Sequence, residues 1–400
     1  MPELAERLGR APVAASVQMT IKARELRAAG KNVIALTIGE PNFDTPMHAI
    51  EAAHQAALKG DTKYPPQDGT LALKQAIQRK FKRDSGLDYA LDEICASNGG
   101  KQCIFNALMA TVNPGDEAVI PVPAWSAYWL MNDLIGGKSV LVTCPQNNGF
   151  KPRAEDIEAA ITPRTKWLIL NNPNNPTGAA CSAEELAKIA DVVRKHPNIW
   201  ILSDDMYEHL VFDDFKHATI AQVAPDLKDR TLTVTGVSKT YAMTGWRIGF
   251  AAGQKQLIRA MVNMQGQVAA GISTVGQAAA AAALDGPQEG VEEMRAAYKR
   301  RRDFVVESLN ACPGISCHKP EGAFYVYPNV AGCLGKTTAG GKKLENDFDF
   351  CMALLEENLV ATVHGAAYGM SPYLRVSTAT DDESLHEACR RIMAFCKGLH

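Results

Sequence analysis

The chain has 400 residues, of which 46% are hydrophobic and 22% are charged, and its formal net charge is −2. This length exceeds what one compact core usually holds, so we expect two domains. The near-neutral charge lacks the concentrated basic face that nucleic-acid binding needs, and no apolar run is long enough to span a membrane.

The first twenty residues carry charges throughout and lack the continuous apolar segment of a secretory signal. The ten cysteines are scattered and form no C-x-x-C pair. For such a chain we expect buried thiols and a cytoplasmic location, where the medium is reducing. Neither the cysteines nor the nine histidines have the spacing of metal ligands, so we expect no metal site.

The middle of the chain alternates short apolar runs with helical patterns. The runs that we expect to be strands buried on both faces are 117–122, 139–144, 166–171, 198–204 and 231–236. Between the third and the fourth run, Ser182 and Glu185 form a capping box ahead of residues with helical periodicity. This alternation predicts the α/β fold class, with a doubly wound and mostly parallel sheet.

The C-terminal part has a different pattern. A long amphipathic helix is expected over 286–312, followed by short strands within 322–328, 359–365 and 373–380 and by a closing helix. We expect these strands to be antiparallel and to form a smaller α+β domain. The large domain is placed at 45–290, and the small domain at 1–44 plus 291–400.

The residues that follow the expected strands gather reactive groups at one edge of the sheet. Ligands of open α/β sheets bind beyond the carboxyl ends of the strands. The side chains expected there are an indole, a carboxamide, a carboxylate, a phenol and an amine: Trp125, Asn175, Asp204, Tyr207 and Lys239. Spacing alone leaves Asp204 and Asp205 as alternatives for the carboxylate.

These groups suit a pyridoxal phosphate site. A lysine amine can form a Schiff base with an aldehyde cofactor, and a buried carboxylate keeps a pyridine nitrogen protonated. A phenol and a carboxamide can hydrogen-bond a ring oxygen, and an indole can stack on the ring. "GGKQ" at 99–102 opens an expected helix whose amides suit a phosphate, with Arg247 as a counter-ion. It is no nucleotide-binding P-loop, because Cys95 stands where that motif needs glycine.

Five ordered motifs resemble those of a known family. They are "GEPNFDTP" (39–46), "GGKQ" (99–102), "NNPNNPTG" (171–178), "DDMYEHL" (204–210) and "SKTYAMTGWRIGF" (238–250). With them the chain resembles the class I, fold-type I pyridoxal-phosphate-dependent aminotransferases, and most closely their bacterial aspartate aminotransferase branch. The similarity extends through "EGAFYVYP" (321–328) and "VHGAAYG" (363–369).

The resemblance implies a role for each cofactor-site residue. Lys239 corresponds to the lysine that carries the cofactor and moves the proton, and Asp204 to the partner of the pyridine nitrogen. The remaining implied contacts to the ring and phosphate come from Tyr207, Asn175, Trp125, Gly99, Gly100, Lys101, Ser238 and Arg247. Tyr64 resembles the tyrosine that reaches the phosphate of a neighbouring subunit, which implies a homodimer.

The substrate residues are also implied by the resemblance. Arg375 corresponds to the arginine that grips the α-carboxylate, near the Gly39 backbone, and the Lys101 side chain lies near the distal carboxylate of aspartate or glutamate. The chain departs from the pattern at two places. Ala14 and Ser16 replace the serine and threonine of "PSAT", and Ala124 replaces an aromatic residue. We expect both changes to lie beside the substrate pocket.

The function expected from these residues is amino transfer between L-aspartate or L-glutamate and a 2-oxo acid such as 2-oxoglutarate, by a ping-pong mechanism. The two departures leave a different or broader specificity open, for prephenate or for aromatic or neutral amino acids. A lyase on the same fold also remains open. A transcription regulator with a transaminase-like domain would need an additional DNA-binding module ahead of the cofactor domain.

Overall fold

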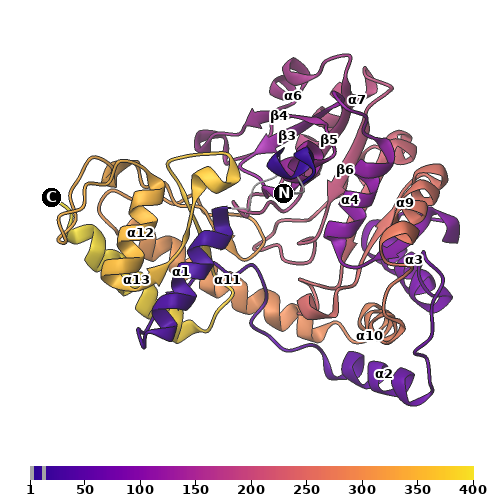
Figure 1. Ribbon diagram of the computed structural model, residues 1–400, viewed down its shortest axis with the longest axis horizontal. Coiled ribbons are helices and arrows are strands. Elements are labelled where there is room, and N and C mark those ends of the chain that lie inside the picture. Colours follow the sequence, from indigo (N-terminus) through magenta and orange to yellow (C-terminus); the bar gives the residue numbers. More distant parts are fainter. Residues whose placement is uncertain (1–3, 11–14) are drawn as a thin grey trace.

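The protein, seen in a computed structural model, is described here over residues 4–10 and 15–400. Figure 1 shows a larger lobe built around a sheet and a smaller lobe with the C-terminus, with α11 (Glu289–Asn310) running between them. The sheet has seven strands in the order β2 (Ile94–Ser97), β8 (Gly249–Ala252), β7 (Thr231–Gly236), β6 (Trp200–Asp204), β5 (Thr165–Asn171), β3 (Glu117–Val122) and β4 (Lys138–Thr143). β8 pairs antiparallel with β7 and β2, and every other pair is parallel.

Helices cover both faces of this sheet, which explains why its strands are apolar on both sides. One face packs against α4 (Gly100–Thr111), α5 (Ala127–Leu134) and α9 (Lys255–Val268). The other packs against α3 (Leu71–Ser85), α6 (Ala154–Ala160), α7 (Ala183–Arg194), α8 (Ile220–Val223) and α10 (Thr274–Asp285). α2 (Met47–Leu58) packs on α10. Ala118 and Val119 illustrate the alternation, since they belong to the apolar clusters of opposite faces.

The five predicted strands are present as β3 to β7, with ends that move by two residues at most. The predicted capping box is confirmed: the Glu185 amide donates to Ser182 Oγ at 3.2 Å, and the Ser182 amide donates to Glu185 Oε2 at 2.7 Å. β2 and β8 were not predicted. Their sequences, ICAS and GFAA, are only four residues long, and each holds a single branched or aromatic side chain, Ile94 or Phe250, which is too few to mark a strand.

The smaller lobe combines helices with short strands. Its helices are α1 (Ala15–Ala28), α12 (Asp347–Asn358) and α13 (Asp382–Lys397), with the C-terminal half of α11. β9 (Tyr325–Val326), β12 (Leu374–Ser377) and β11 (Val363–His364) form an antiparallel sheet, as predicted. β1 (Ile34–Ala35) and β10 (Val360–Ala361) pair in parallel instead, which corrects the expectation for this part of the chain.

The two lobes meet beside the end of β6. The Phe212 amide donates to Glu321 O at 2.8 Å, and the Ala323 amide donates to Leu210 O at 2.7 Å. Separate apolar clusters lie in the two lobes. We therefore propose the division into a large domain at 45–290 and a small domain at 1–44 plus 291–400. All ten cysteines are buried free thiols, and within the described residues no helix is long and apolar enough to cross a membrane.

Candidate active site

A cavity of about 380 Å³ lies beyond the carboxyl ends of β3, β5, β6 and β7, against the small lobe. Eleven of the predicted site residues line it: Gly39, Gly100, Lys101, Trp125, Asn175, Asp204, Tyr207, Ser238, Lys239, Arg247 and Arg375. Six further lining residues were not predicted: Ile104, Tyr128, Asn171, Met206, Thr244 and Tyr325. The groups expected at the sheet edge thus share one cavity.

Lys239 follows β7 and points into this cavity. Its Nζ donates a hydrogen bond to Gly39 O at 2.5 Å. Burial lowers the pKa of the Lys239 amine to about 8, an effect that the nearby Arg375 and Arg247 charges reinforce and the Glu40 carboxylate opposes. A larger share of this amine is therefore neutral at physiological pH than for an exposed lysine.

Asp204 ends β6 and, among the residues that the structure describes, is the one carboxylate that lines the cavity. Its Oδ2 accepts a hydrogen bond from the Tyr128 hydroxyl at 2.6 Å, and its Oδ1 accepts one from the Met206 amide at 3.2 Å. Burial raises the pKa of Asp204 to about 6, and the bond from Tyr128 opposes that rise because it stabilises the ionised form. Asp205 does not line the cavity, so the geometry separates the two candidates that spacing left open.

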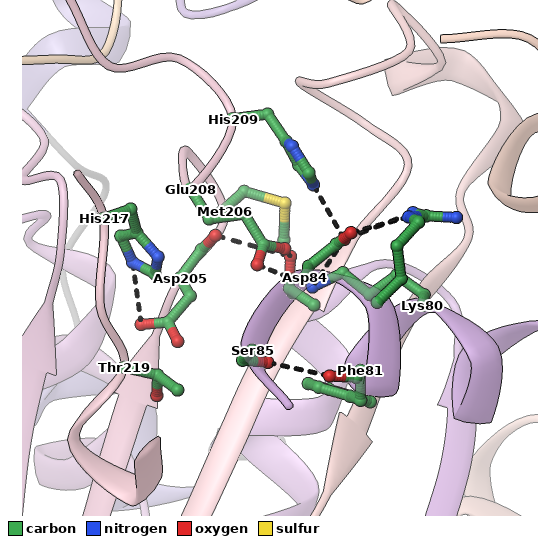
Figure 2. A network of polar contacts seen from close by, with 12 residues as sticks. Lys80, Phe81, Asp84, Ser85, Asp205, Met206, Glu208, His209, His217 and Thr219 are labelled. Carbon is green, nitrogen blue, oxygen red and sulfur yellow. Dashed lines mark hydrogen bonds and ion pairs between the residues drawn. The ribbon is translucent and has the colours of Figure 1, made fainter. Parts of the chain in front are cut away.

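Behind Asp204, the side chains of its neighbours enter a buried polar network (Figure 2). Asp205 Oδ1 accepts from Ser203 Oγ at 2.8 Å, and Lys80 Nζ on α3 donates to Glu208 Oε2 at 2.6 Å. Asp84, Glu208 and His209 are the one group among the described residues with the geometry of a metal site. Lys80 also lies 3.6 Å from Asp84 Oδ2, so an amine already supplies the positive charge there. The network fixes the segment 204–209 from behind.

The N-terminus of α4 forms another wall of the cavity. Gly99 precedes the helix with φ +85°, and a Cβ built there would lie 2.5 Å from Arg247 Nη2. The Arg247 guanidinium donates only to backbone carbonyls, Thr244 O at 2.9 Å and Asn98 O at 3.4 Å. A helix N-terminus beside a guanidinium without a carboxylate partner in the described chain is suited to an anion.

The small lobe contributes Arg375, which is buried on β12. Its Nη1 donates to Asn175 Oδ1 at 3.2 Å and its Nη2 donates to Thr37 O at 2.5 Å. The guanidinium lies over the rings of Tyr325 at 4.8 Å and Tyr368 at 5.1 Å. These contacts hold the planar group in one orientation, as bidentate recognition of a carboxylate requires.

Charge is unevenly distributed in the cavity. Four cationic side chains line it, Lys101, Lys239, Arg247 and Arg375, against the single carboxylate of Asp204. None of the four forms an ion pair with a carboxylate of the described residues. Lys101 lies 5.0 Å from the Trp125 ring, and burial followed by repulsion from Arg247 lowers its pKa. Such an excess of positive charge favours a ligand with several negative charges.

Among the predicted positions that the structure describes, Gly99, Tyr64 and Ala124 do not line the cavity of this chain. Tyr64 is 94% exposed and lies in a separate surface hollow with residues 269–275. The Ser16 side chain and residue 14 fall outside the described part of the chain. Ala124 is buried, and it lines a small void of about 30 Å³ behind the cavity instead of the cavity itself. This void shares Tyr128 and Asn171 with the cavity, so the expectation that Ala124 lies beside the substrate pocket stays a prediction.

The family follows from comparison with known proteins. The sequence model described as "Aminotransferase class I and II" matches residues 31–392. The chain belongs to this family. The aspartate/prephenate aminotransferase of Cereibacter sphaeroides is 54% identical over 399 residues, covering 100% of both chains, and the aspartate aminotransferase of Rhizobium meliloti is 49% identical, covering 99% of this chain and 96% of that protein.

Solved structures agree with the fold. A crystal structure of the aspartate aminotransferase from Rhizobium meliloti has a TM-score of 0.98, is 48% identical and covers 100% of both chains. The Thermus thermophilus aspartate aminotransferase with maleate has a TM-score of 0.92 at 38% identity, covering 99% of this chain and 100% of that one. The predicted fold type I architecture is confirmed, and the protein is an aminotransferase.

Two of the cavity residues that the sequence did not predict are the tyrosines Tyr128 and Tyr325. Tyr128 lies one helical turn after Trp125 on α5, so its reach to Asp204 depends on how that helix docks. Tyr325 lies in the "EGAFYVYP" motif, which carried the resemblance without a chemical role for its members. Its hydroxyl lies 2.9 Å from that of Tyr207. Both contacts join segments that are distant along the chain.

Proposed function

We propose that this aminotransferase moves the amino group between L-aspartate or L-glutamate and a 2-oxo acid such as 2-oxoglutarate, in a ping-pong cycle with pyridoxal 5′-phosphate as cofactor. The observation that carries the proposal is the cavity itself, in which four cations surround one buried carboxylate. A phosphate and two substrate carboxylates would use these cations. The names of the relatives support the same substrates.

The residues present fit the cofactor at three points. Gly99 leaves no side chain between the α4 N-terminus and Arg247, which suits the phosphate. Asp204 suits the pyridine nitrogen, and the amine of Lys239 suits the aldehyde. Pyridoxal 5′-phosphate supplies, when bound, an aldehyde that joins to amines and a ring that takes up electrons. Gly100, the Lys101 amide and Ser238 complete the proposed phosphate site, and Trp125 the proposed stacking partner of the ring.

Lys239 is proposed as the group that binds the cofactor and carries the proton. Both tasks need the neutral amine. With a pKa of about 8, about a tenth of the amine is neutral at pH 7, and this fraction rises as the pH rises through 8. The same amine can then take the proton from the substrate Cα and release it again, because its pKa lies near the working pH.

Asp204 is proposed to hold the positive charge of the protonated ring nitrogen. With a pKa of about 6 the carboxylate is mostly ionised at pH 7, as that task requires. Tyr207 and Asn175 are proposed to bond the ring oxygen from the opposite side. These groups orient the cofactor, while the lining side chains exclude bulk water from the reacting atoms.

Arg375 and Lys101 are proposed to recognise a dicarboxylic substrate. Arg375 presents a fixed fork to the α-carboxylate, with the Gly39 backbone beside it, and Lys101 presents a single charge to the distal carboxylate. Ser16 remains a proposed substrate contact from α1. The Thermus thermophilus structure has maleate, a four-carbon dicarboxylate, which fits this pairing of cations.

Prephenate is a second candidate substrate, as an amino acceptor. The Cereibacter sphaeroides relative is named for both aspartate and prephenate. Prephenate combines a 2-oxo acid with a second carboxylate on its ring, so the same two cations suit it. Phenylpyruvate lacks the ring carboxylate and is the matched control. If prephenate is a substrate through this contact, the enzyme will use it in preference to phenylpyruvate.

We also infer a homodimer in the cytoplasm. Tyr64 lies away from the cavity of its own chain and is almost fully exposed, so its phenol is available to the phosphate site of a second copy. Sedimentation velocity gives the mass in solution. Mixing Tyr64→Phe chains with Lys239→Ala chains then tests the shared site. In each dimer that contains one chain of either kind, one of the two active sites would keep both Tyr64 and Lys239.

The test of the proposed function is a single-turnover experiment. The purified protein with pyridoxal 5′-phosphate is mixed with L-aspartate, L-glutamate, L-phenylalanine or L-alanine, and the 2-oxo acid released is quantified. The proposal expects one equivalent of oxaloacetate from aspartate, and continued turnover only when a second 2-oxo acid is added. Turnover of amino acids without any added oxo acid would indicate a lyase, and reaction with phenylalanine alone would contradict the dicarboxylic specificity.

A further inference from the structure

Tyr325 occupies the point where the substrate-binding and cofactor-binding groups of the cavity meet. It is fully buried on β9 of the small lobe and lines the cavity. Its hydroxyl lies 2.9 Å from the Tyr207 hydroxyl, which belongs to the large lobe. Its ring face lies 4.8 Å from the Arg375 guanidinium. One side chain therefore contacts the proposed ring-oxygen donor and the proposed carboxylate fork.

The backbone around Tyr325 is fixed on two sides. Ser377 is its partner in the β12 ladder, two residues from Arg375, so the ring and the guanidinium hold a constant register. On the other side, a Cβ built at Gly39 would lie 2.7 Å from the Tyr325 hydroxyl oxygen. The same Gly39 accepts the hydrogen bond from Lys239. Strand pairing thus keeps Tyr325 in register with Arg375, and its hydroxyl lies close to Gly39; both of these neighbours line the cavity.

The two contacts of Tyr325 use different parts of the side chain. The ring alone stacks against Arg375, and a phenylalanine would keep that contact. The hydroxyl alone reaches Tyr207, and a phenylalanine would lose it. A hydrogen bond donated by Tyr325 would direct the proton of Tyr207 to the cavity and make that phenol a stronger donor, because chains of hydrogen bonds polarise one another.

We propose that Tyr325 is a positioning residue that couples substrate binding to the cofactor: its ring holds Arg375 for the α-carboxylate, and its hydroxyl holds Tyr207 as a donor to the ring oxygen. This rests on the proposed function, and it adds to that function a link between the two halves of the site. The titratable groups that interact with Tyr207 include Tyr325, Arg375, Asp204 and Tyr128.

The experiment uses the cofactor-loaded enzyme and the variants Tyr325→Phe, Tyr325→Leu and Tyr207→Phe. A donor to the ring oxygen stabilises its deprotonated form, so weakening that donor raises the pH midpoint of the absorbance change of the bound cofactor. Tyr325→Phe is expected to raise this midpoint and to lower kcat by about 3- to 10-fold, the effect of one hydrogen bond, with KM for aspartate unchanged. Tyr325→Leu is expected to raise KM as well, because Arg375 loses its stacking partner.

Tyr327→Phe is the matched control. Tyr327 is an equally buried tyrosine two residues along, and its hydroxyl donates to Gly365 O and Met370 O within the small lobe. It is expected to leave the midpoint and KM unchanged. If instead it shifts the midpoint as Tyr325→Phe does, the effect reflects general loosening of the small lobe, and the proposal is wrong.

A double-mutant cycle decides whether Tyr325 acts by positioning Tyr207 or only supports the structure of the small lobe. In the Tyr207→Phe background, Tyr325→Phe is expected to cause no further shift of the midpoint, because its partner hydroxyl is absent. An equal shift in both backgrounds would overturn the proposal, as would no shift in either. A wild-type protein that binds no cofactor or releases no oxo acid from aspartate would instead refute the proposed function, so the two failures are distinguishable.

Discussion

Replacing Gly99 by alanine tests the proposed phosphate site. The new Cβ would lie 2.5 Å from Arg247 Nη2, about 1 Å inside normal contact, so the guanidinium must move. We expect the loss of one charge-assisted hydrogen bond to the phosphate, worth about 1.5–3 kcal/mol, and therefore cofactor binding that is about 10- to 150-fold weaker. The backbone at φ +85° and ψ 160° lies in a region essentially confined to glycine, which adds a separate loss of stability of about 1–3 kcal/mol.

Gly86→Ala separates these two effects. Gly86 caps α3 with φ +68°, and a Cβ there meets no atom within 4 Å. Both variants are expected to lose stability in urea denaturation, Gly99→Ala more than Gly86→Ala because only Gly86 has the left-handed helical conformation that other residues can adopt. Only Gly99→Ala is expected to lose affinity in a fluorescence titration of the apoprotein with pyridoxal 5′-phosphate. Equal affinity in the two variants would refute the assignment of the phosphate to the α4 N-terminus and Arg247.

Three further predictions concern other parts of the site. Lys101→Met should raise KM for L-aspartate by about tenfold or more, because a charged contact to the distal carboxylate is lost, and should leave KM for L-phenylalanine unchanged. Steady-state assays that show the same rise in KM for both amino acids would contradict the proposed role of Lys101. The affinity of the apoprotein for pyridoxal 5′-phosphate should fall as the pH falls through about 6, because Asp204 takes up a proton there, and Tyr128→Phe should move this midpoint upward. Lys80→Met leaves the buried Glu208 carboxylate without its amine and should lower the free energy of unfolding by about 3–5 kcal/mol. Adding Glu208→Gln should restore part of this stability. A loss of under about 1 kcal/mol would contradict the network of Figure 2.

Much of the large lobe could be predicted because its strands are buried on both faces. Runs such as 117–122 and 231–236 are rich in apolar and β-branched residues, and Trp125 and Lys239 follow their carboxyl ends at one edge of the sheet. β2 and β8 were not predicted because they are four residues long and mostly built of small residues. Gly249 on β8, the second strand from the edge of the sheet, pairs with Gly236 and Ser97, and close backbone approach there replaces side-chain bulk.

The remaining site residues depend on tertiary contacts that no local pattern contains. Tyr128 and Tyr325 act through partners 76 and 118 positions away, so spacing gave no signal for either. Ala124 and Trp125 follow β3 side by side, and only the packing of this connection shows that Trp125 lines the cavity while Ala124 lines the small void behind it.

The amine that binds the cofactor can be identified directly. The purified holoenzyme is reduced with borohydride, digested with a protease, and mapped by mass spectrometry for the lysine that retains the pyridoxyl group. We expect Lys239 to carry the modification, and we expect L-aspartate added before the reductant to prevent it. Modification of Lys101 instead, or an active enzyme in which Lys239 stays unmodified after reduction, would contradict this expectation.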